Sequence, residues 1–188
     1  LSILIDAIPC KNLISFADTE IATISSDSES ALLNAVSKLN SSGGVIYINT
    51  PVINISTKKT INLSGKISGG IVGKKLSDGT YPRINFKKAR DSGSTARGFT
   101  ISGQNQFMKF LIIENAGDNG IWINGASNTL DHIITRYNND SGIQLSDNAN
   151  GNTLNYCYSY RNVDVNTYGA NADGFAPKLG LADRKSVV

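Results

Sequence analysis

The chain has 188 residues, of which 40% are hydrophobic and 18% charged, and its net charge is +3. This length and balance predict one globular domain with a sizeable core and exclude a disordered chain. The small net charge, with no Lys- and Arg-rich segment interleaved with aromatic residues, argues against a nucleic-acid partner. No apolar run approaches the roughly 18 residues of a membrane span, and the 18 glycines predict many tight turns.

A helix is the first element that the sequence predicts, over residues 26–40, after an N-terminal extension at 1–25. Ser26 and Glu29 fit a capping box, in which the serine caps the helix and the glutamate reaches back to its amide. One apolar stripe follows at helical spacing: Leu32, Ala35, Val36 and Leu39. Only strand patterns come later, so we expect this helix to cap the open end of a stacked-strand core.

Short β-branched segments come next, at 45–48, 52–55 and 67–72. A Gly-apolar-x-apolar repeat then begins at positions 98, 120 and 142, which are evenly spaced, and recurs after a longer interval at Gly174. We interpret the surplus as a loop inserted around 164–170. A second apolar column has nearly the same spacing: Met108, Leu130 and Leu154. This period predicts an all-β parallel β-helix with about 22 residues per coil; a leucine-rich repeat is disfavoured because its leucine-dense consensus and recurring helix are missing.

Stacked coils place equivalent positions of the repeat about 4.8 Å apart, in columns. The inward columns should be Ile121 and Ile143 beneath Phe175, and Leu111, Ile133 and Cys157. The outward columns should be Trp122 and Gln144 beneath Ala176, and Phe110, His132 and Tyr156. The only histidine, His132, is therefore interpreted as a member of a side-chain ladder and not as a catalytic base. Cys157 is interpreted as a buried, inert thiol.

Four strings of the sequence carry a resemblance to a known family. Residues 171–179, Asn-Ala-Asp-Gly-Phe-Ala-Pro-Lys-Leu, resemble the Asn-Ala-Asp-Gly-Phe-x-x-Lys motif of the pectate lyases of polysaccharide lyase family nine. Segments 116–121, 139–144 and 158–162 follow that family's coils in the same order. The resemblance is good from about 97 to 179 and weaker from 21 to 86. It implies a right-handed parallel β-helix, a secreted or extracellular protein, and β-elimination on polygalacturonate.

The resemblance also implies a site, of which this chain carries one part. In the family, aspartates hold Ca²⁺ and a lysine is the base, and one calcium ligand maps onto Asp173. The remaining aspartates belong to a Ser-Asp-Asp-Gly-x-Asp string about one coil later, and the base to a Gly-Phe-Lys-Leu string further on; neither occurs in this sequence. Because Ca²⁺ takes six to eight oxygen ligands, we expect an inactive N-terminal fragment of an active parent enzyme, with no catalytic residue of its own.

Several residues keep two interpretations. Lys178 is a candidate substrate-binding residue, or a solvated lysine at the end of a ladder. Asp173 is a calcium ligand in the parent, or simply a turn aspartate before glycine. Trp122 could stack on a sugar or be a half-buried strand residue. Asp118 and Asp140 are interpreted as turn residues, and Arg161 and Asp164 are weaker candidates for substrate contacts.

Three classes of function remain open on the sequence alone. The first is a calcium-dependent pectate lyase, monomeric, whose partner is an acidic polysaccharide. The second is a non-catalytic β-helix, such as an adhesin or a carbohydrate-binding surface protein, because the fold serves both roles. The third, a galacturonan hydrolase, would need clustered acid and base carboxylates. Residues 183–188 leave the repeat and match one frame of a common sequencing adapter, so we expect a non-native tail there.

Overall fold

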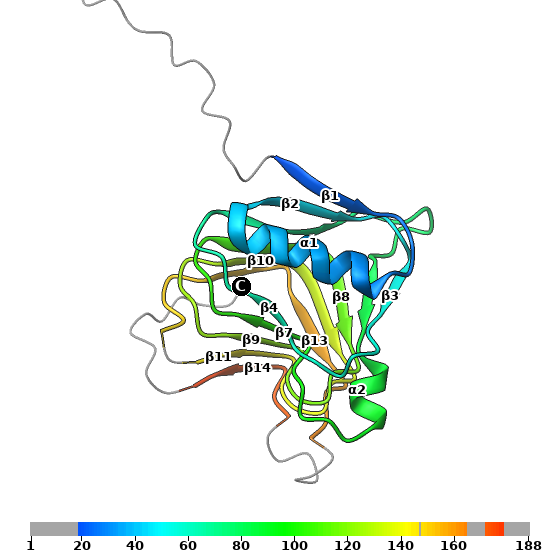
Figure 1. Cartoon of the computed structure of the whole chain (residues 1–188). Helices are drawn as coiled ribbons and strands as arrows, with labels where there is room; N and C mark the ends of the chain where they lie inside the picture. Colours follow the sequence, from blue (N-terminus) through cyan, green and yellow to red (C-terminus); the bar gives the residue numbers. More distant parts are fainter. Residues whose placement is uncertain (1–18, 147, 165–171, 179–188) are drawn as a thin grey trace, which may run out of the picture.

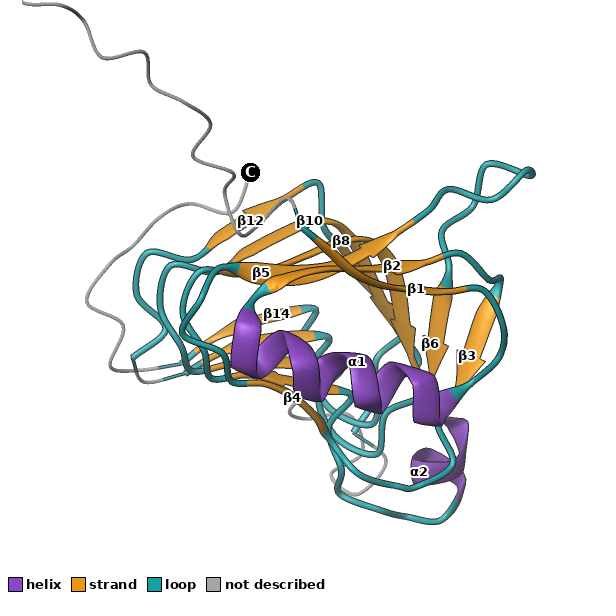
Figure 2. Cartoon of the chain, turned by 45° about the horizontal axis from the view of Figure 1, so that its top comes forward, coloured by secondary structure: helices purple, strands orange, loops and turns teal. Residues whose placement is uncertain are grey.

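Parallel strands wound into successive coils form the body of the protein. The computed structural model describes residues 19–146, 148–164 and 172–178. Every strand pair in these ranges is parallel, and the strands form one sheet of nine and one of five. The right-handed parallel β-helix predicted from the sequence is therefore confirmed, with the two sheets facing each other across a core of aliphatic side chains (Figures 1 and 2).

Each coil contributes strands to both sheets. The nine-stranded sheet contains β1 (Glu20–Ile24), β2 (Gly44–Ile48), β3 (Val52–Asn54), β5 (Gly69–Gly73), β6 (Arg83–Asn85), β8 (Gln106–Glu114), β10 (Thr129–Arg136), β12 (Thr153–Asn155) and β13 (Tyr158–Tyr160). The five-stranded sheet contains β4 (Ile61–Leu63), β7 (Phe99–Ile101), β9 (Ile121–Ile123), β11 (Ile143–Leu145) and β14 (Phe175–Pro177). In Figure 1 the five-stranded sheet descends strand by strand from β4 to β14.

The repeat in the sequence is the pitch of the coil. Phe99 pairs with Ile121, and Ile121 with Ile143, so two successive coils have the same length, which is the period of the repeat. Ile143 pairs with Phe175 in the same register, although a longer stretch of chain separates them. The surplus residues therefore leave the strand register unchanged, although the loop itself lies mostly outside the described residues. The coil that precedes β7 is also longer, because the turn after β5 and the short helix α2 (Lys87–Asp91) are inserted in it.

The predicted columns are present. Met108, Leu130 and Leu154 are register partners, and the inward residues Ile121, Ile143, Leu111 and Ile133 are fully buried. Cys157 packs against the core but is only half-buried, since it lies beside the edge strand β13. The predicted outward column contains Trp122, Gln144 and Ala176. Ala176 faces outward in this register, but its small side chain is buried, with 3% of the residue exposed.

A ladder of rings marks one corner of the coil. The ring centroids of Phe110 and His132 lie 5.0 Å apart, and those of His132 and Tyr156 lie 4.8 Å apart. All three residues have positive φ angles, of 57°, 52° and 48°. This left-handed conformation costs a non-glycine residue on the order of 1–3 kcal/mol. Each ring pair contributes roughly 0.5–1.5 kcal/mol, so stacking offsets much of that cost and holds the corner.

Helix α1 (Glu29–Ser42) lies across the N-terminal end of the coils, over β2 and β4 (Figures 1 and 2). Its predicted apolar stripe of Leu32, Ala35, Val36 and Leu39 is buried against that end. The predicted cap at Ser26 is wrong, because Ser28 caps the helix with its hydroxyl accepting from the Ala31 amide at 3.3 Å. The helix accordingly spans 29–42 and not 26–40.

The carboxylate of Glu29 does not reach back to form a capping box. It accepts hydrogen bonds from the Ser56 amide (2.9 Å), the Ser56 hydroxyl (2.6 Å) and the Thr57 amide (3.1 Å). Burial raises the pKa of Glu29, but these hydrogen bonds outweigh it and hold the pKa below its usual value. The side chain thus joins the helix to the loop after β3.

Two further boundaries differ from the sequence patterns. The strand expected at 67–72 is observed at Gly69–Gly73, and Ile67 lies outside it with 43% of its surface exposed. Strand β1 falls within the segment 1–25 and pairs with β2, so the nine-stranded sheet begins before the capping helix. Residues 183–188 lie outside the described residues.

Candidate functional site

The two site residues expected from the sequence lie at opposite ends of β14. Asp173 lies two residues before the strand, and its carbonyl accepts from the Gly142 amide at 3.0 Å. Lys178 directly follows it, and its amide donates to the Leu145 carbonyl at 2.9 Å. Both side chains are exposed. Five residues of extended chain place the two Cα atoms roughly 16 Å apart, so the two side chains serve different parts of the surface.

Trp122 occupies the middle of the outward face of the same sheet, in the column that ends at Ala176. Its Nε1 donates to Ser146 Oγ at 2.7 Å. The guanidinium of Arg97 lies over the ring, 4.1 Å from the centroid. The interpretation of Trp122 as a half-buried strand residue is therefore supported, since an arginine already covers its ring where a sugar would stack.

A chain of polar contacts surrounds this tryptophan. Arg97 Nε donates to Asn119 Oδ1 at 3.3 Å, and Asn119 Nδ2 donates to Gln144 Oε1 at 3.3 Å. Gln144 Nε2 in turn donates to Ser146 Oγ at 3.0 Å. The sequence patterns did not single out Arg97 or Asn119. Both directly precede a glycine of the repeat, as Asp173 does, and that shared position is the signal that could have found them.

Asp118 and Asp140 are turn residues, as expected. Asp118 Oδ1 accepts from the Asn119 amide at 2.8 Å, and Asp140 Oδ1 accepts from the Ser141 amide at 2.6 Å. The two carboxyls also contact each other across neighbouring coils. Burial raises the pKa of Asp118, and the contact with Asp140 raises it further, while Arg97 at 3.8 Å offsets part of the effect.

The raised pKa of Asp118 makes a prediction about stability. Because the folded state holds the ionised carboxyl less well than the unfolded chain does, Asp118 should lower stability as pH rises above its unfolded pKa. Asp118→Asn should therefore stabilise the protein at pH 7, by up to about 1 kcal/mol for partly exposed charges, and have little effect near pH 3. Urea unfolding at both pH values measures the difference. Equal destabilisation at both would contradict the interpretation.

The described residues do not by themselves fit a calcium site. Within ranges 19–146, 148–164 and 172–178, no group of three or more His, Cys, Asp or Glu side chains could hold a metal ion. Asp173 offers one exposed carboxylate, whereas Ca²⁺ takes six to eight oxygens. The assignment of Asp173 as a ligand remains a prediction, and no catalytic step follows from the residues at hand.

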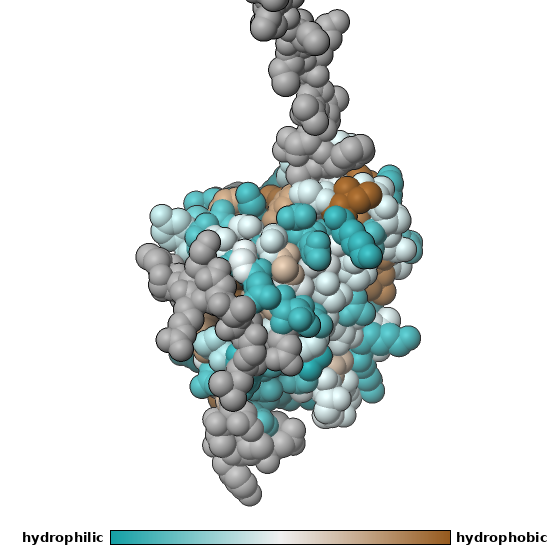
Figure 3. Space-filling view, turned by 90° about the vertical axis from the view of Figure 1, so that its left-hand side faces the viewer, coloured by the Kyte–Doolittle hydropathy of each residue, from teal (hydrophilic) through white to brown (hydrophobic). Residues whose placement is uncertain are grey.

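The remaining candidates lie in, between or after strands of the nine-stranded sheet. His132 belongs to the ring ladder, and its Nδ1 lies 2.8 Å from Asp131 Oδ1. Burial raises the pKa of the Cys157 thiol, which suits an inert residue. Arg161 lies at the end of β13, and Asp164 is half-buried after it. The face in Figure 3 is mostly hydrophilic, with hydrophobic residues gathered near its upper edge.

These coils and the helix across their end define a right-handed parallel β-helix. The family described as "Pel9A-like, right handed beta helix region" matches residues 15–186, and the chain belongs to that family. In the part that the structure describes, neither helix has the length and apolar character needed to cross a membrane.

Similar proteins carry the name pectate lyase. Pectate lyase L of Paenibacillus polymyxa is 33% identical over 146 residues, which are 73% of this chain and 32% of the relative. Pectate lyase L of Dickeya chrysanthemi is 27% identical over 125 residues, 63% of this chain and 28% of the relative. The crystal structure of pectate lyase Pel9A matches with a TM-score of 0.67 at 20% identity, covering 88% of this chain and 44% of that one, and shows the fold. The chain thus spans about a third of the curated relatives' length.

Proposed function

We propose that this chain forms the N-terminal coils of a secreted, monomeric pectate lyase that cleaves polygalacturonate by calcium-assisted β-elimination. The observation that carries the proposal is the exposed Asp173 just before β14, within a chain that belongs to the Pel9A-like family. The names of the similar proteins support the same substrate class. The base lysine and the other calcium ligands are then supplied by residues outside this chain.

The proposal gives this chain's own residues limited roles. The coils fix the position of Asp173, because its backbone is hydrogen-bonded to the preceding coil at Gly142. Lys178, at the far end of β14, is a contact for a carboxylate of the acidic polymer, as a compact positive charge on a flexible stem. The proposed calcium would act as a Lewis acid on a uronate carboxylate of the substrate.

The coding sequence beyond codon 182 provides the first test. We expect a Ser-Asp-Asp-Gly-x-Asp string about one coil past Asp173, followed by a Gly-Phe-Lys-Leu string, since the chemistry needs several oxygen ligands and a base. Continued coils without either string would leave the lyase without its chemistry. A non-catalytic carbohydrate-binding β-helix would then be the better proposal.

The second test is the variant Asp173→Asn in the longer protein. Removing a calcium-ligand carboxylate should reduce the elimination rate at least about 100-fold, the upper range for groups that merely support a metal ligand. The rate is followed by ultraviolet absorbance of the unsaturated product, at several calcium concentrations. Asp91→Asn is the matched control, because among the described residues Asp91 pairs with Lys87 alone, at an exposed position of α2. If the calcium dependence of the rate were unchanged in Asp173→Asn, Asp173 would not be a calcium ligand.

A further inference from the structure

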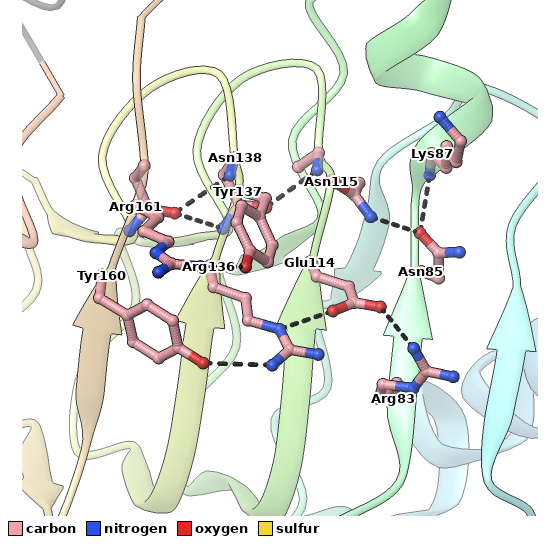
Figure 4. Close-up of polar contacts among 12 residues, drawn as sticks. Arg83, Asn85, Lys87, Glu114, Asn115, Arg136, Tyr137, Asn138, Tyr160 and Arg161 are labelled. Atoms are coloured by element: carbon pink, nitrogen blue, oxygen red, sulfur yellow. Dashed lines mark hydrogen bonds and ion pairs between the residues drawn. The ribbon is translucent and has the colours of Figure 1, made fainter.

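A cluster of arginine and tyrosine side chains lies on the outer face of the nine-stranded sheet, whereas β14 belongs to the five-stranded sheet. We define the arginine–tyrosine cluster as Arg136, Tyr137, Tyr160 and Arg161 (Figure 4). These residues stand at the C-terminal ends of β10 and β13, which pair with each other in neighbouring coils. The proposed calcium site and its polymer contacts do not account for this cluster.

The side chains of the cluster hold one another in place. Arg136 Nη1 donates to the Tyr160 hydroxyl at 3.1 Å, and Arg161 Nη1 donates to the Tyr137 hydroxyl at 2.9 Å. The guanidinium carbons of Arg136 and Arg161 lie 5.6 Å and 5.9 Å from the Tyr137 ring centroid. The Tyr137 and Tyr160 rings meet edge to face at 6.5 Å. The surface is therefore ordered before any ligand arrives, which reduces the entropic cost of binding.

A buried carboxylate of the preceding coil holds Arg136 in place. Glu114, with 5% of its side chain exposed, accepts from Arg136 Nε at 2.7 Å and pairs with Arg83 Nη1 at 3.4 Å (Figure 4). One carboxylate thus faces two arginines, and Arg161 adds a third positive charge beside them. The excess charge favours an anionic partner.

The surface also offers exposed aromatic rings. Tyr158 is 63% exposed and Tyr160 is 40% exposed. Both belong to outward columns, since they pair with Ile134 and Arg136, while Thr135 of the same strand is fully buried. Ile112 and Glu114 occupy the same columns two coils earlier and are 7% and 4% exposed, so the exposure of the two tyrosines belongs to β13 as the edge strand of the described sheet.

We propose that the arginine–tyrosine cluster, together with Tyr158, is a further binding surface for a carboxylate-bearing polysaccharide, in addition to the proposed contacts at Asp173 and Lys178. Arginine forks match carboxylates, and flat tyrosine rings with a polar tip suit sugar faces. Arg136 lies beside Tyr160, and Tyr137 beside Arg161, at equivalent positions of neighbouring coils about 4.8 Å apart, so each column offers one arginine and one tyrosine to a polymer. The choice of an acidic sugar rests on the proposed function, and the surface would hold the enzyme on its polymeric substrate.

Binding of polygalacturonate oligomers to the full chain, measured by calorimetry, tests the proposal. The variant carries Arg161→Asn and Tyr158→Ala together; asparagine tolerates the φ of 54° at position 161. Lys66→Gln is the matched control, as it removes the same charge from an exposed position elsewhere. We expect at least about a tenfold loss of affinity in the double variant and none in the control. Circular dichroism melts check that both variants fold like the unaltered chain.

Three results would overturn the proposal. Equal losses in the double variant and in Lys66→Gln would show general attraction, and undetectable binding by the unaltered chain would remove the surface altogether. Tighter binding of dextran sulfate than of polygalacturonate would exclude a carboxylated sugar as the preferred ligand. Failure of the proposed lyase function has a separate readout, since elimination by the longer protein is followed by absorbance and does not depend on this binding measurement.

Discussion

Replacing Asn128 with leucine is expected to lower the free energy of unfolding by about 2–5 kcal/mol, because buried polar groups would lose their partners. Asn128 is 1% exposed. Its Oδ1 accepts from the Gln106 amide at 2.8 Å, and its Nδ2 donates to the Gly103 carbonyl at 3.1 Å. Leucine has a similar size but can form neither hydrogen bond. The Gln106 amide and the Gly103 carbonyl of the preceding coil would then lose their side-chain partner.

The same arrangement recurs one coil later, which explains why the effect should be large. Asn152 Oδ1 accepts from the Asn128 amide at 2.7 Å, and its Nδ2 donates to the Gly125 carbonyl at 2.9 Å. Each asparagine of this ladder therefore completes the turn of the coil before it. Replacing one member disturbs the stacking of both neighbours.

Urea unfolding, followed by circular dichroism and by fluorescence of the single tryptophan, measures this cost. Asn34→Leu is the matched control, since Asn34 lies on the exposed side of α1. That exchange should change stability by no more than about 0.5 kcal/mol. If both variants unfolded at the same urea concentration, the ladder would not be a main source of stability.

The variant Phe99→Ala is expected to cost about 3–5 kcal/mol, the range for removing a large buried ring. Phe99 is fully buried and pairs in register with Ile61 and Ile121 in the coils on either side. Its ring meets that of Phe86 edge to face, with centroids 5.8 Å apart and planes at 85°. Truncation would leave a cavity between coils that the parallel strands cannot close by a local shift.

Thermal and urea unfolding of this variant can be compared with Tyr158→Ala, which removes a 63% exposed ring of another strand. The exposed truncation should cost well under about 1 kcal/mol. Phe99→Leu should recover part of the loss, because it restores apolar volume. A cost for Phe99→Ala no greater than for Tyr158→Ala would show that the core relaxes around the cavity.

Much of the fold follows from the repeat, because a parallel β-helix converts sequence period directly into strand register. Equivalent positions pair across coils, so the inward column of Ile121 and Ile143 and the ladder at His132 could be predicted without coordinates. The start of α1 could not be predicted in this way. Local capping rules favoured Ser26, but the Glu29 carboxylate accepts a hydrogen bond from the Ser56 amide of another coil, and Ser28 caps the helix instead.

The sequence by itself determined the coil period, the buried columns, the family resemblance and the position of Asp173, since each depends on spacing along the chain. The tertiary structure alone decided the contacts between positions that are not equivalent in the repeat. It placed Arg97 over Trp122 and Arg83 against Glu114. Those contacts depend on the directions of side chains and on the inserted segments, which a period of residues does not specify.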